Sequence, residues 1–324
     1  MERTEFSANR RGLQVLERWA KRFPERRWAI EGANGLGRTL SQRLVCAEEE
    51  VVDVPAKLSA RVRVLSIGHG RKNDELDATF TALAAWRNER LARVRPDEGT
   101  DVLRLLTERR EDLVSERTRV LNRLHGLLRD LVPGGVPGML SADRAARILR
   151  GVRPRRDSRS AAYSVRRRMA SELVRDVRAL DRKIAGLGAE IREEVQRSGT
   201  SLTEIFGVGP ILAAKIIGLT GNVARFPSKG HFASYAGVAP IEVSSGEVVR
   251  HRLSLAGNRS LNHALHMIAI NQVRYEGEGG IYYRKKIAEG KTHREAMRCL
   301  KRRVSDAVFK KLSADSEEKI PMAV

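Results

Sequence analysis

Residues 27–57 read RWAIEGANGLGRTLSQRLVCAEEEVVDVPAK, and this stretch decides the fold class of the first part of the chain. The run at residues 27–31 is short and apolar and predicts a strand. Leucines then recur every four residues and predict a helix over residues 35–47. Residues 51–55 are apolar, end in proline and predict a second strand. Because a strand, a helix and a strand follow one another, we expect a largely parallel sheet.

The segments on either side of this stretch predict helices. Apolar residues recur at helical spacing between Leu13 and Phe23. After a loop at residues 68–70, a helix is expected from near Asn73, with apolar side chains on one face. We therefore expect an α/β domain over residues 1–95, although no opening hairpin precedes its first strand.

The middle of the chain has a different periodicity. Apolar residues recur every seven positions from Leu106 to Leu127, and a second seam from Leu173 to Val195 alternates spacings of four and three. This pattern predicts an antiparallel coiled coil over residues 96–197, and the alternative is two ordinary core helices of a bundle.

The last part, residues 198–324, predicts a third, mostly helical domain. Residues 201–204 have the capping-box spacing of a helix start. The following segment, FGVGPILAA, reads as the turn of a helix-hairpin-helix motif, whose glycines and helix start suit contact with a phosphate. A plain connection between helices is the alternative. Further helices are expected over residues 211–219, 257–272 and 291–312, and the last ten residues are expected to fray.

The charge of the chain indicates a polyanionic partner. The 324 residues include 61 Lys and Arg against 40 Asp and Glu, which gives a formal net charge of +21. Nucleic acid is the expected partner, because its phosphates release counterions when basic side chains replace them. A membrane is not expected as a partner, since no segment approaches the ~20 apolar residues that span a bilayer. The first 25 residues lack a signal-peptide core, and Cys46 and Cys299 fit thiols in a reducing cytosol.

Three acidic residues of the first domain are candidate metal ligands. Asp74 and Asp77 lie three residues apart on an expected helix and so share a face, and Glu31 ends an expected strand. Converging carboxylates suit Mg²⁺, which prefers hard oxygen ligands. The alternatives are that the aspartates complement a helix dipole and that Glu31 caps a turn.

A serine pair is the candidate nucleophile. Ser244 and Ser245 precede Gly246 in an expected loop, where a hydroxyl could reach a phosphodiester. Most serines in such loops are turn residues, and no His or Lys partner stands nearby in the sequence.

Taken together, these segments resemble a known family. Seven motifs follow one another in the chain: WAIEG (28–32), VPAK (54–57), GRKNDELDA (70–78), FGVGP (206–210), FASYAGVAP (232–240), SG (245–246) and AGNR (256–259). Their order resembles the DEDD-type insertion-sequence transposases, which are guided by a bridge RNA and are related to the Piv-type DNA invertases. The resemblance extends from about residue 10 to residue 312, and its motifs are specific in combination.

The resemblance implies a fold of the α/β plus α class. It implies an RNase H-like (RuvC-like) DEDD domain, a coiled-coil segment and a C-terminal transposase domain with a helix-hairpin-helix. It also implies an acidic tetrad that binds Mg²⁺ and a serine that attacks DNA to form a covalent phosphoserine link. The implied partners are DNA and a guide RNA, in a homodimer or homotetramer.

The family's functional residues carry over by position. Glu31, Asp74 and Asp77 match the second, third and fourth acidic residues of the tetrad, and Ser245 matches the serine better than Ser244 does. Expected nucleic-acid contacts are Gly207, Gly209, Lys215, Arg252, Asn258 and Arg259. The first acidic residue of the family has no counterpart between Met1 and Glu31, so we expect a chain that lacks the first strand of its first domain.

Three functions remain open from the sequence. The first is a Mg²⁺-dependent transposase or recombinase, cytoplasmic and associated with the nucleoid. The second is a catalytically dead remnant that still binds nucleic acid. The third is a RuvC-like nuclease that uses metal-bound water and no covalent serine.

Overall fold

The computed structural model describes residues 2–65, 74–88, 91–96, 99–152, 161–245, 248–252 and 257–318. The chain forms two compact units. The first comprises Met1–Glu98 with Asn222–His231, and the second comprises Gly99–Gly221 with Phe232–Val324. The division into domains at residues 1–95, 96–197 and 198–324 stays a prediction.

The first unit contains a small parallel sheet flanked by helices. Its elements are α1 (Arg10–Ala20), β1 (Trp28–Glu31), α2 (Arg38–Cys46), β2 (Val51–Val54), α3 (Ala56–Val64), α4 (Asp74–Trp86) and the short 3-10 helix η3 (Val223–Arg225). β1 and β2 pair in parallel, with Trp28 opposite Val51 and Glu31 opposite Val54. The predicted strand–helix–strand order and parallel pairing are confirmed.

The core of this unit lies between the sheet and α4. Val52 and Val54 of β2 pack with Ala84 and Ala85 of α4. The short helix α3 was not predicted, because its sequence AKLSARVRV mixes apolar and basic residues without a clear helical period. The expected loop at residues 68–70 and the helix start at Asn73 lie outside the described residues.

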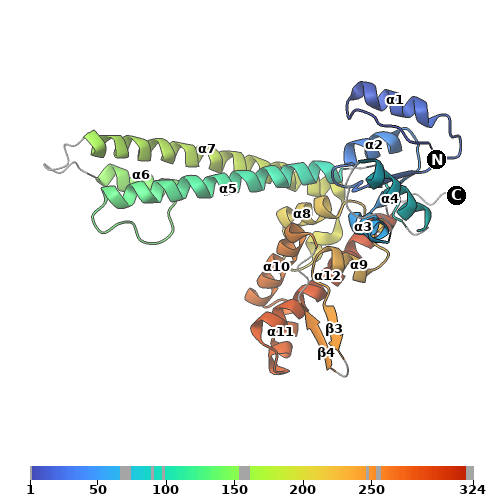
Figure 1. The fold of residues 1–324 in the computed structure, drawn as a ribbon. Helices are drawn as coiled ribbons and strands as arrows, with labels where there is room; N and C mark the ends of the chain where they lie inside the picture. Colours follow the sequence, from blue (N-terminus) through green and yellow to red (C-terminus); the bar gives the residue numbers. More distant parts are fainter. Residues whose placement is uncertain are drawn as a thin grey trace. The chain divides into compact units, whose positions relative to one another are not determined.

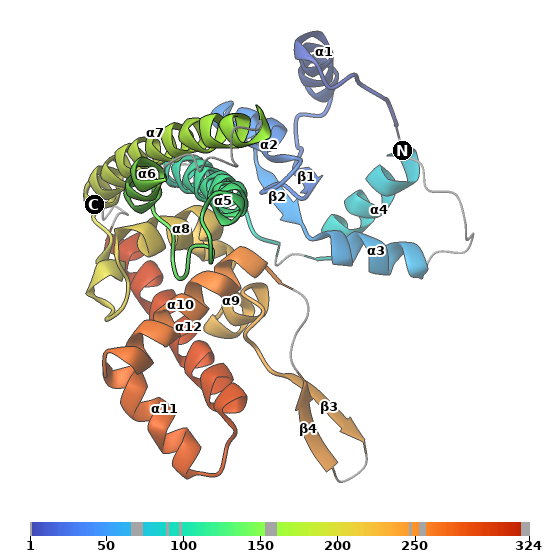
Figure 2. The ribbon, with the colours of Figure 1, turned by 90° about the vertical axis from the view of Figure 1, so that its left-hand side faces the viewer.

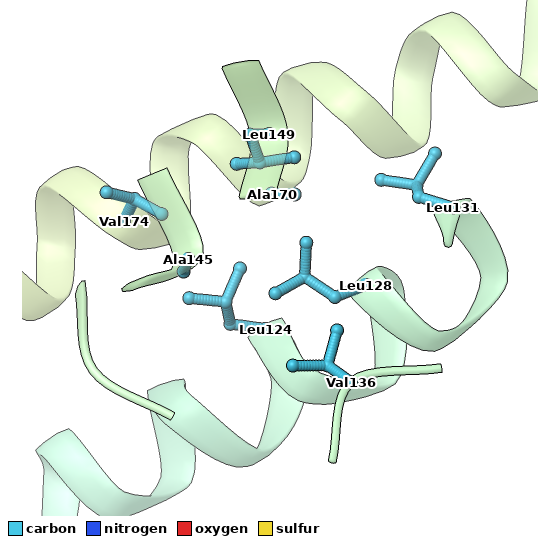
Figure 3. Close-up of a cluster of buried hydrophobic side chains, with 8 residues drawn as sticks. All are labelled: Leu124, Leu128, Leu131, Val136, Ala145, Leu149, Ala170 and Val174. Atoms are coloured by element: carbon cyan, nitrogen blue, oxygen red, sulfur yellow. The ribbon is translucent and has the colours of Figure 1, made fainter. Parts of the chain in front are cut away.

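The second unit begins with a long helical hairpin. The helices α5 (Thr100–Leu131) and α7 (Ala161–Ser198) run antiparallel and side by side, as predicted (Figure 1). A third helix, α6 (Ala142–Gly151), packs against both and was not predicted. Figure 3 shows the cluster of buried side chains that the three helices share: Leu124, Leu128, Leu131, Val136, Ala145, Leu149, Ala170 and Val174.

The rest of the second unit is helical apart from one β-hairpin. Its elements are η2 (Ser201–Glu204), α8 (Pro210–Thr220), β3 (Ile241–Ser245), β4 (Val248–Arg252), α10 (Arg259–Arg274), α11 (Glu278–Ala288) and α12 (His293–Glu318). The helix α9 (Lys229–Tyr235) begins in the first unit and enters the second at Phe232. Figure 2 shows the hairpin extending away from α10, α11 and α12. None of the described helices is both long and apolar enough to cross a membrane.

Two predictions for the start of this unit's last part differ from the structure. The capping box at Ser201 is wrong, because Thr200 Oγ1 accepts the cap hydrogen bond from the Leu202 amide. Ser201 Oγ instead donates to Asp315 Oδ1 of α12, at 2.6 Å, so a tertiary partner replaces the local one. The element before the Gly207–Gly209 turn is a single 3-10 turn, which makes the expected helix-hairpin-helix incomplete as a pair of α-helices.

Two further predictions are corrected. Ser244 and Ser245 lie on β3 and not in a loop, because pairing with β4 extends the strand up to Ser245. The predicted fraying of the last ten residues is wrong for residues 315–318, which remain in α12. The hydrogen bonds of Asp315 to Thr200 and Ser201 explain why this end of the helix is ordered.

Candidate functional site

The carboxylate of Glu31 lies close to helix α4. Glu31 is the last residue of β1 and is exposed. The hydroxyl of Thr81 lies 3.3 Å from Glu31 Oε2 and 2.8 Å from the carbonyl oxygen of Asp77, so its single proton is donated to one or the other. Thr81 is buried and is also 3.4 Å from Ser59 Oγ of α3. This hydroxyl network joins the end of β1 to the turn of α4 that follows Asp77.

Asp74 and Asp77 lie in the first turn of α4. Asp77 is partly buried, and its Oδ1 lies 3.5 Å from Arg63 Nη1. Asp74 is exposed, one turn earlier on the same helix. The structure therefore brings the carboxylate of Glu31 close to Thr81, whose hydroxyl also lies near the backbone carbonyl of Asp77. Among the described residues, no three His, Cys, Asp or Glu side chains form a group able to hold a metal ion.

Asp53 supports the loop after Glu31, and the sequence reasoning missed it. Its Oδ1 accepts a hydrogen bond from the Ala33 amide at 2.9 Å, and its Oδ2 accepts one from Asn34 Nδ2 at 2.9 Å. Both bonds fix the turn that follows β1. A single carboxylate inside the apolar strand VVDV was the signal available, because a polar residue there needs a partner.

The candidate serines lie on the β-hairpin of the second unit. Ser245 is opposite Val248 and Ser244 is opposite Val249 in the antiparallel register. Because directly opposed residues share a face and faces alternate along a strand, Ser245 shares its face with positions 250 and 252, both arginines. The position of Ser244 shares the other face with His251.

The base of the hairpin is held by a network of hydrogen bonds. The Tyr235 hydroxyl donates to the Leu219 carbonyl at 3.1 Å and accepts from Asn258 Nδ2 at 3.2 Å. The Asn258 amide donates to the Tyr235 carbonyl at 2.6 Å. At Gly257, where φ is +103°, a Cβ would lie 2.7 Å from the Tyr235 carbonyl oxygen. The motifs FASYAGVAP and AGNR therefore join the two ends of the segment that carries the serines.

The predicted phosphate contacts at the FGVGP turn have different surroundings. Gly207, at φ +88°, packs against α10, where a Cβ would lie 3.1 Å from Asn271 Cβ. Gly209 has no heavy atom within 4 Å of such a Cβ and precedes the first turn of α8. The side chain of Lys215 is 12% exposed and forms an ion pair with Glu111 of α5. Of Gly207, Gly209 and Lys215, Gly209 is therefore the residue with free space around it.

The other predicted contacts lie around the hairpin base. Arg252 is the last residue of β4. Asn258 caps α10, with its Oδ1 accepting from the Leu261 amide at 2.9 Å. Arg259 is the exposed first residue of α10. Capping of α10 is a sufficient structural role for Asn258. For Arg259, no contact among the described residues indicates a structural role.

Comparisons with known proteins identify the family that this chain resembles. The family model for DEDD transposases of the IS110 type matches residues 1–133. The model described as the transposase IS116/IS110/IS902 family matches residues 199–284. The two models together cover more than half of the chain, and they include every candidate residue named above.

Individual relatives match over most of their length. An uncharacterized 44.8 kDa protein of insertion element IS116 from Streptomyces clavuligerus is 28% identical over 90% of this chain and 83% of its own. An uncharacterized 42 kDa protein of IS900 from Mycobacterium paratuberculosis is 27% identical, with 85% of this chain and 80% of its own covered. A 43.6 kDa protein of IS110 from Streptomyces coelicolor is also 27% identical. The chain therefore belongs to the IS110/IS116/IS902 family of DEDD-type insertion-sequence transposases.

Proposed function

We propose that this transposase mobilises an insertion sequence by Mg²⁺-dependent recombination, with Ser245 as the nucleophile that forms a covalent link to DNA. The observation that carries the proposal is the Thr81 network, which places Glu31 at the end of β1 beside the turn of α4 that carries Asp77. An RNase H-like arrangement of the first domain agrees with the parallel pairing of β1 and β2.

By donor type, the residues around this network suit a divalent metal ion, although they do not form a group of three able to hold one in the described structure. Glu31, Asp74 and Asp77 offer only carboxylate oxygens, the hard donors that Mg²⁺ prefers. The hydroxyls of Thr81 and Ser59 lie beside them and add no soft ligand. A bound Mg²⁺ supplies Lewis-acid polarisation of a phosphodiester. The chain's own part is to hold the carboxylates, and Arg63 Nη1 lies 3.5 Å from Asp77 Oδ1.

Ser245 would perform the covalent step. Its Oγ forms a bond to the scissile phosphorus while the bond from phosphorus to one sugar oxygen breaks. The serine proton passes to a base or to solvent, and the departing sugar oxygen takes up a proton. The arginines at positions 250 and 252 share the strand face of Ser245, where they would neutralise a phosphate. This placement favours Ser245 over Ser244.

The remaining residues would bind nucleic acid. Gly209 offers an open helix start at α8, and Arg252 and Arg259 lie on either side of the hairpin base. We also propose a guide RNA and a dimeric or tetrameric assembly, in which the hairpin of α5 and α7 would contribute to the contact between subunits. Both follow from the family resemblance.

A test of the nucleophile compares two neighbouring serines. Ser245→Ala should abolish the covalent protein–DNA adduct, whereas Ser244→Ala should retain it at no less than about a third of the wild-type yield. The adduct is measured after denaturation, by comigration of labelled DNA with the protein. An adduct that survives Ser245→Ala would contradict the assignment, and cleavage without an adduct in every variant would favour the metal-water nuclease.

The acidic site provides the second arm of this test. Asp74→Asn should abolish strand transfer and leave the affinity for DNA within about twofold, because the carboxylate acts on the metal and not on phosphate binding. Glu75→Gln, one residue on in the same helix turn, is the matched control. If wild-type protein binds DNA but forms no adduct and no strand-transfer product at any Mg²⁺ concentration, the binding-remnant alternative is favoured.

A further inference from the structure

A group of basic side chains lies where α12 packs against the first turns of α10. Lys301 of α12 donates from Nζ to Asn262 Oδ1 at 2.6 Å. Asn262 is itself fixed, since its Nδ2 donates to the carbonyl oxygens of Ala236 and Gly237 at 2.9 and 3.0 Å. The ammonium group of Lys301 is thereby held beside the start of α10, next to the network that anchors the serine hairpin.

The positive charge at this place is not compensated. Within the described residues, neither Lys301 nor Arg259 forms an ion pair, although many other basic residues of the chain do. Burial and the neighbouring Arg259 lower the pKa of Lys301. Arg259 is also the first residue of α10, where the helix dipole disfavours a cation. Among the described residues no carboxylate offsets this charge, and a bound anion would do so.

Two histidines extend the group along α10. His263 and His266 lie one turn apart, and Nδ1 of His266 is buried with no hydrogen-bond partner among the described residues. Burial, followed by the charges of Lys301 and His263, lowers the pKa of His266. The side chains of Lys301, Arg259 and the two histidines can each donate a hydrogen bond. In the described structure, none of them donates to a carboxylate.

A purely structural role does not require the charge of Lys301. Its single hydrogen bond to Asn262 could be made by a neutral amide of similar length. An ammonium group kept partly buried without a counter-ion lowers the stability of the folded protein. The presence of a lysine here is explained if a ligand supplies the missing negative charge.

We propose that Lys301, Arg259 and His263 form a phosphate-binding site that holds one phosphodiester group of bound nucleic acid. The ligand class follows from the donor set, which combines two basic side chains with an imidazole and includes no acidic residue. The site lies at the base of the serine hairpin, because the Asn258 amide before Arg259 is bonded to the Tyr235 carbonyl. A backbone phosphate held there fixes the strand beside the hairpin.

Fluorescence anisotropy with a labelled DNA duplex, and in parallel with an RNA duplex, tests the site. Lys301→Gln should weaken the binding of at least one duplex about tenfold and reduce the slope of log affinity against log salt by about one. Lys301→Arg should stay within about threefold of the wild type. Lys310→Gln removes the same charge from an exposed position of the same helix and should change affinity less than twofold.

Thermal unfolding separates binding from a structural role. Lys301→Gln should unfold at the wild-type temperature or above it, and inorganic phosphate should raise the unfolding temperature of the wild type more than that of the variant at matched ionic strength. A fall in stability that accompanies the loss of binding would overturn the proposal. Arg259→Gln is the second variant, and it should reproduce the weaker binding without loss of stability.

Two other results would also overturn it. One is an equal loss of duplex affinity in Lys301→Gln and Lys310→Gln, which would indicate that binding depends on the overall charge of the protein and not on this site. The other is a phosphate effect on stability without any effect of Lys301→Gln on duplex affinity, which would indicate a free anion as the ligand. The inference rests on the proposed function only for the identity of its ligand as nucleic acid. If no covalent adduct forms through Ser245, the proposed recombination chemistry is refuted. The expected differences in duplex affinity between the Lys301 and Lys310 variants do not depend on that result.

Discussion

At the scale of single residues, Glu49 shows how one carboxylate secures the first unit. It accepts hydrogen bonds from Arg26 and from Trp28 Nε1, which ties the start of β1 to the segment before β2. The hydrogen bond from Arg26 lowers the pKa of Glu49 below its ordinary value of 4.5, against the opposing effect of burial. The folded state therefore favours the charged carboxylate.

This contact predicts a pH-dependent stability. Because the folded pKa is lowered, the stabilisation is present above pH 4.5 and is lost as the pH falls through the folded value. Glu49→Gln should lower the unfolding temperature at pH 7 by about 2–4 °C. The difference from the wild type should shrink below pH 4.5, as followed by circular dichroism. A constant difference across this range would contradict the assigned cause.

Single residues also show where the sequence was sufficient and where it was not. Glu31 and Asp77 could be placed from strand and helix patterns, because those depend on neighbours along the chain. Thr81 and Lys301 could not, because their partners lie 50 and 39 residues away. Lys215 was expected to face nucleic acid, yet its ion pair with Glu111 depends on the packing of α8 on α5, which no local pattern encodes.

At the scale of elements, the packing of α8 on α5 depends on a glycine. A Cβ at Gly218 would lie 2.7 Å from Arg104 Cα and 2.8 Å from Arg104 N, closer than such atoms can approach. At Gly186, in α7, no heavy atom lies within 4 Å of such a Cβ. Gly218 therefore permits the close approach of two helices, whereas a side chain at Gly186 would meet open space.

Substitution of these glycines by alanine should have opposite effects. Gly218→Ala should destabilise the protein by about 1–3 kcal/mol, because α8 and α5 must separate. Gly186→Ala should stabilise it by up to about 1 kcal/mol, because alanine restricts the unfolded chain and favours the helix. Urea unfolding measures both. If both substitutions changed the free energy of unfolding negligibly, α8 and α5 would be able to separate without loss of stability.

The elements themselves were largely predictable, and their ends were less so. The apolar periodicities of α5, α7, α8 and α10 are strong, and these helices occur where expected. The helix α6 escaped notice because it is only ten residues long and follows a Pro/Gly segment, although its buried residues Ala142, Ala145 and Leu149 do recur at helical spacing. The position of Ser245 on a strand depends on its pairing with β4, a non-local feature.

At the scale of the whole molecule, the net charge of +21 predicts strongly salt-dependent binding. Affinity for duplex DNA or structured RNA should fall linearly with salt on logarithmic axes. If six or more phosphates are contacted, the loss between 50 and 200 mM salt should reach about a thousandfold. Anisotropy titrations at four salt concentrations measure the slope. A flat dependence would indicate a protein partner in place of a polyanion.

The length of the helical hairpin of α5 and α7 would amplify small rotations at its contact with α8. The contact of α8 with α5 includes Glu111, and α5 continues for 20 further residues to Leu131, about 30 Å of helix. A rotation of about 10° at that contact would therefore move the far end of α5 by about 5 Å. Small adjustments of α8, whose first turn follows Gly209, would be magnified at the hairpin tip. Binding at the proposed nucleic-acid contact of Gly209 would then displace the tip.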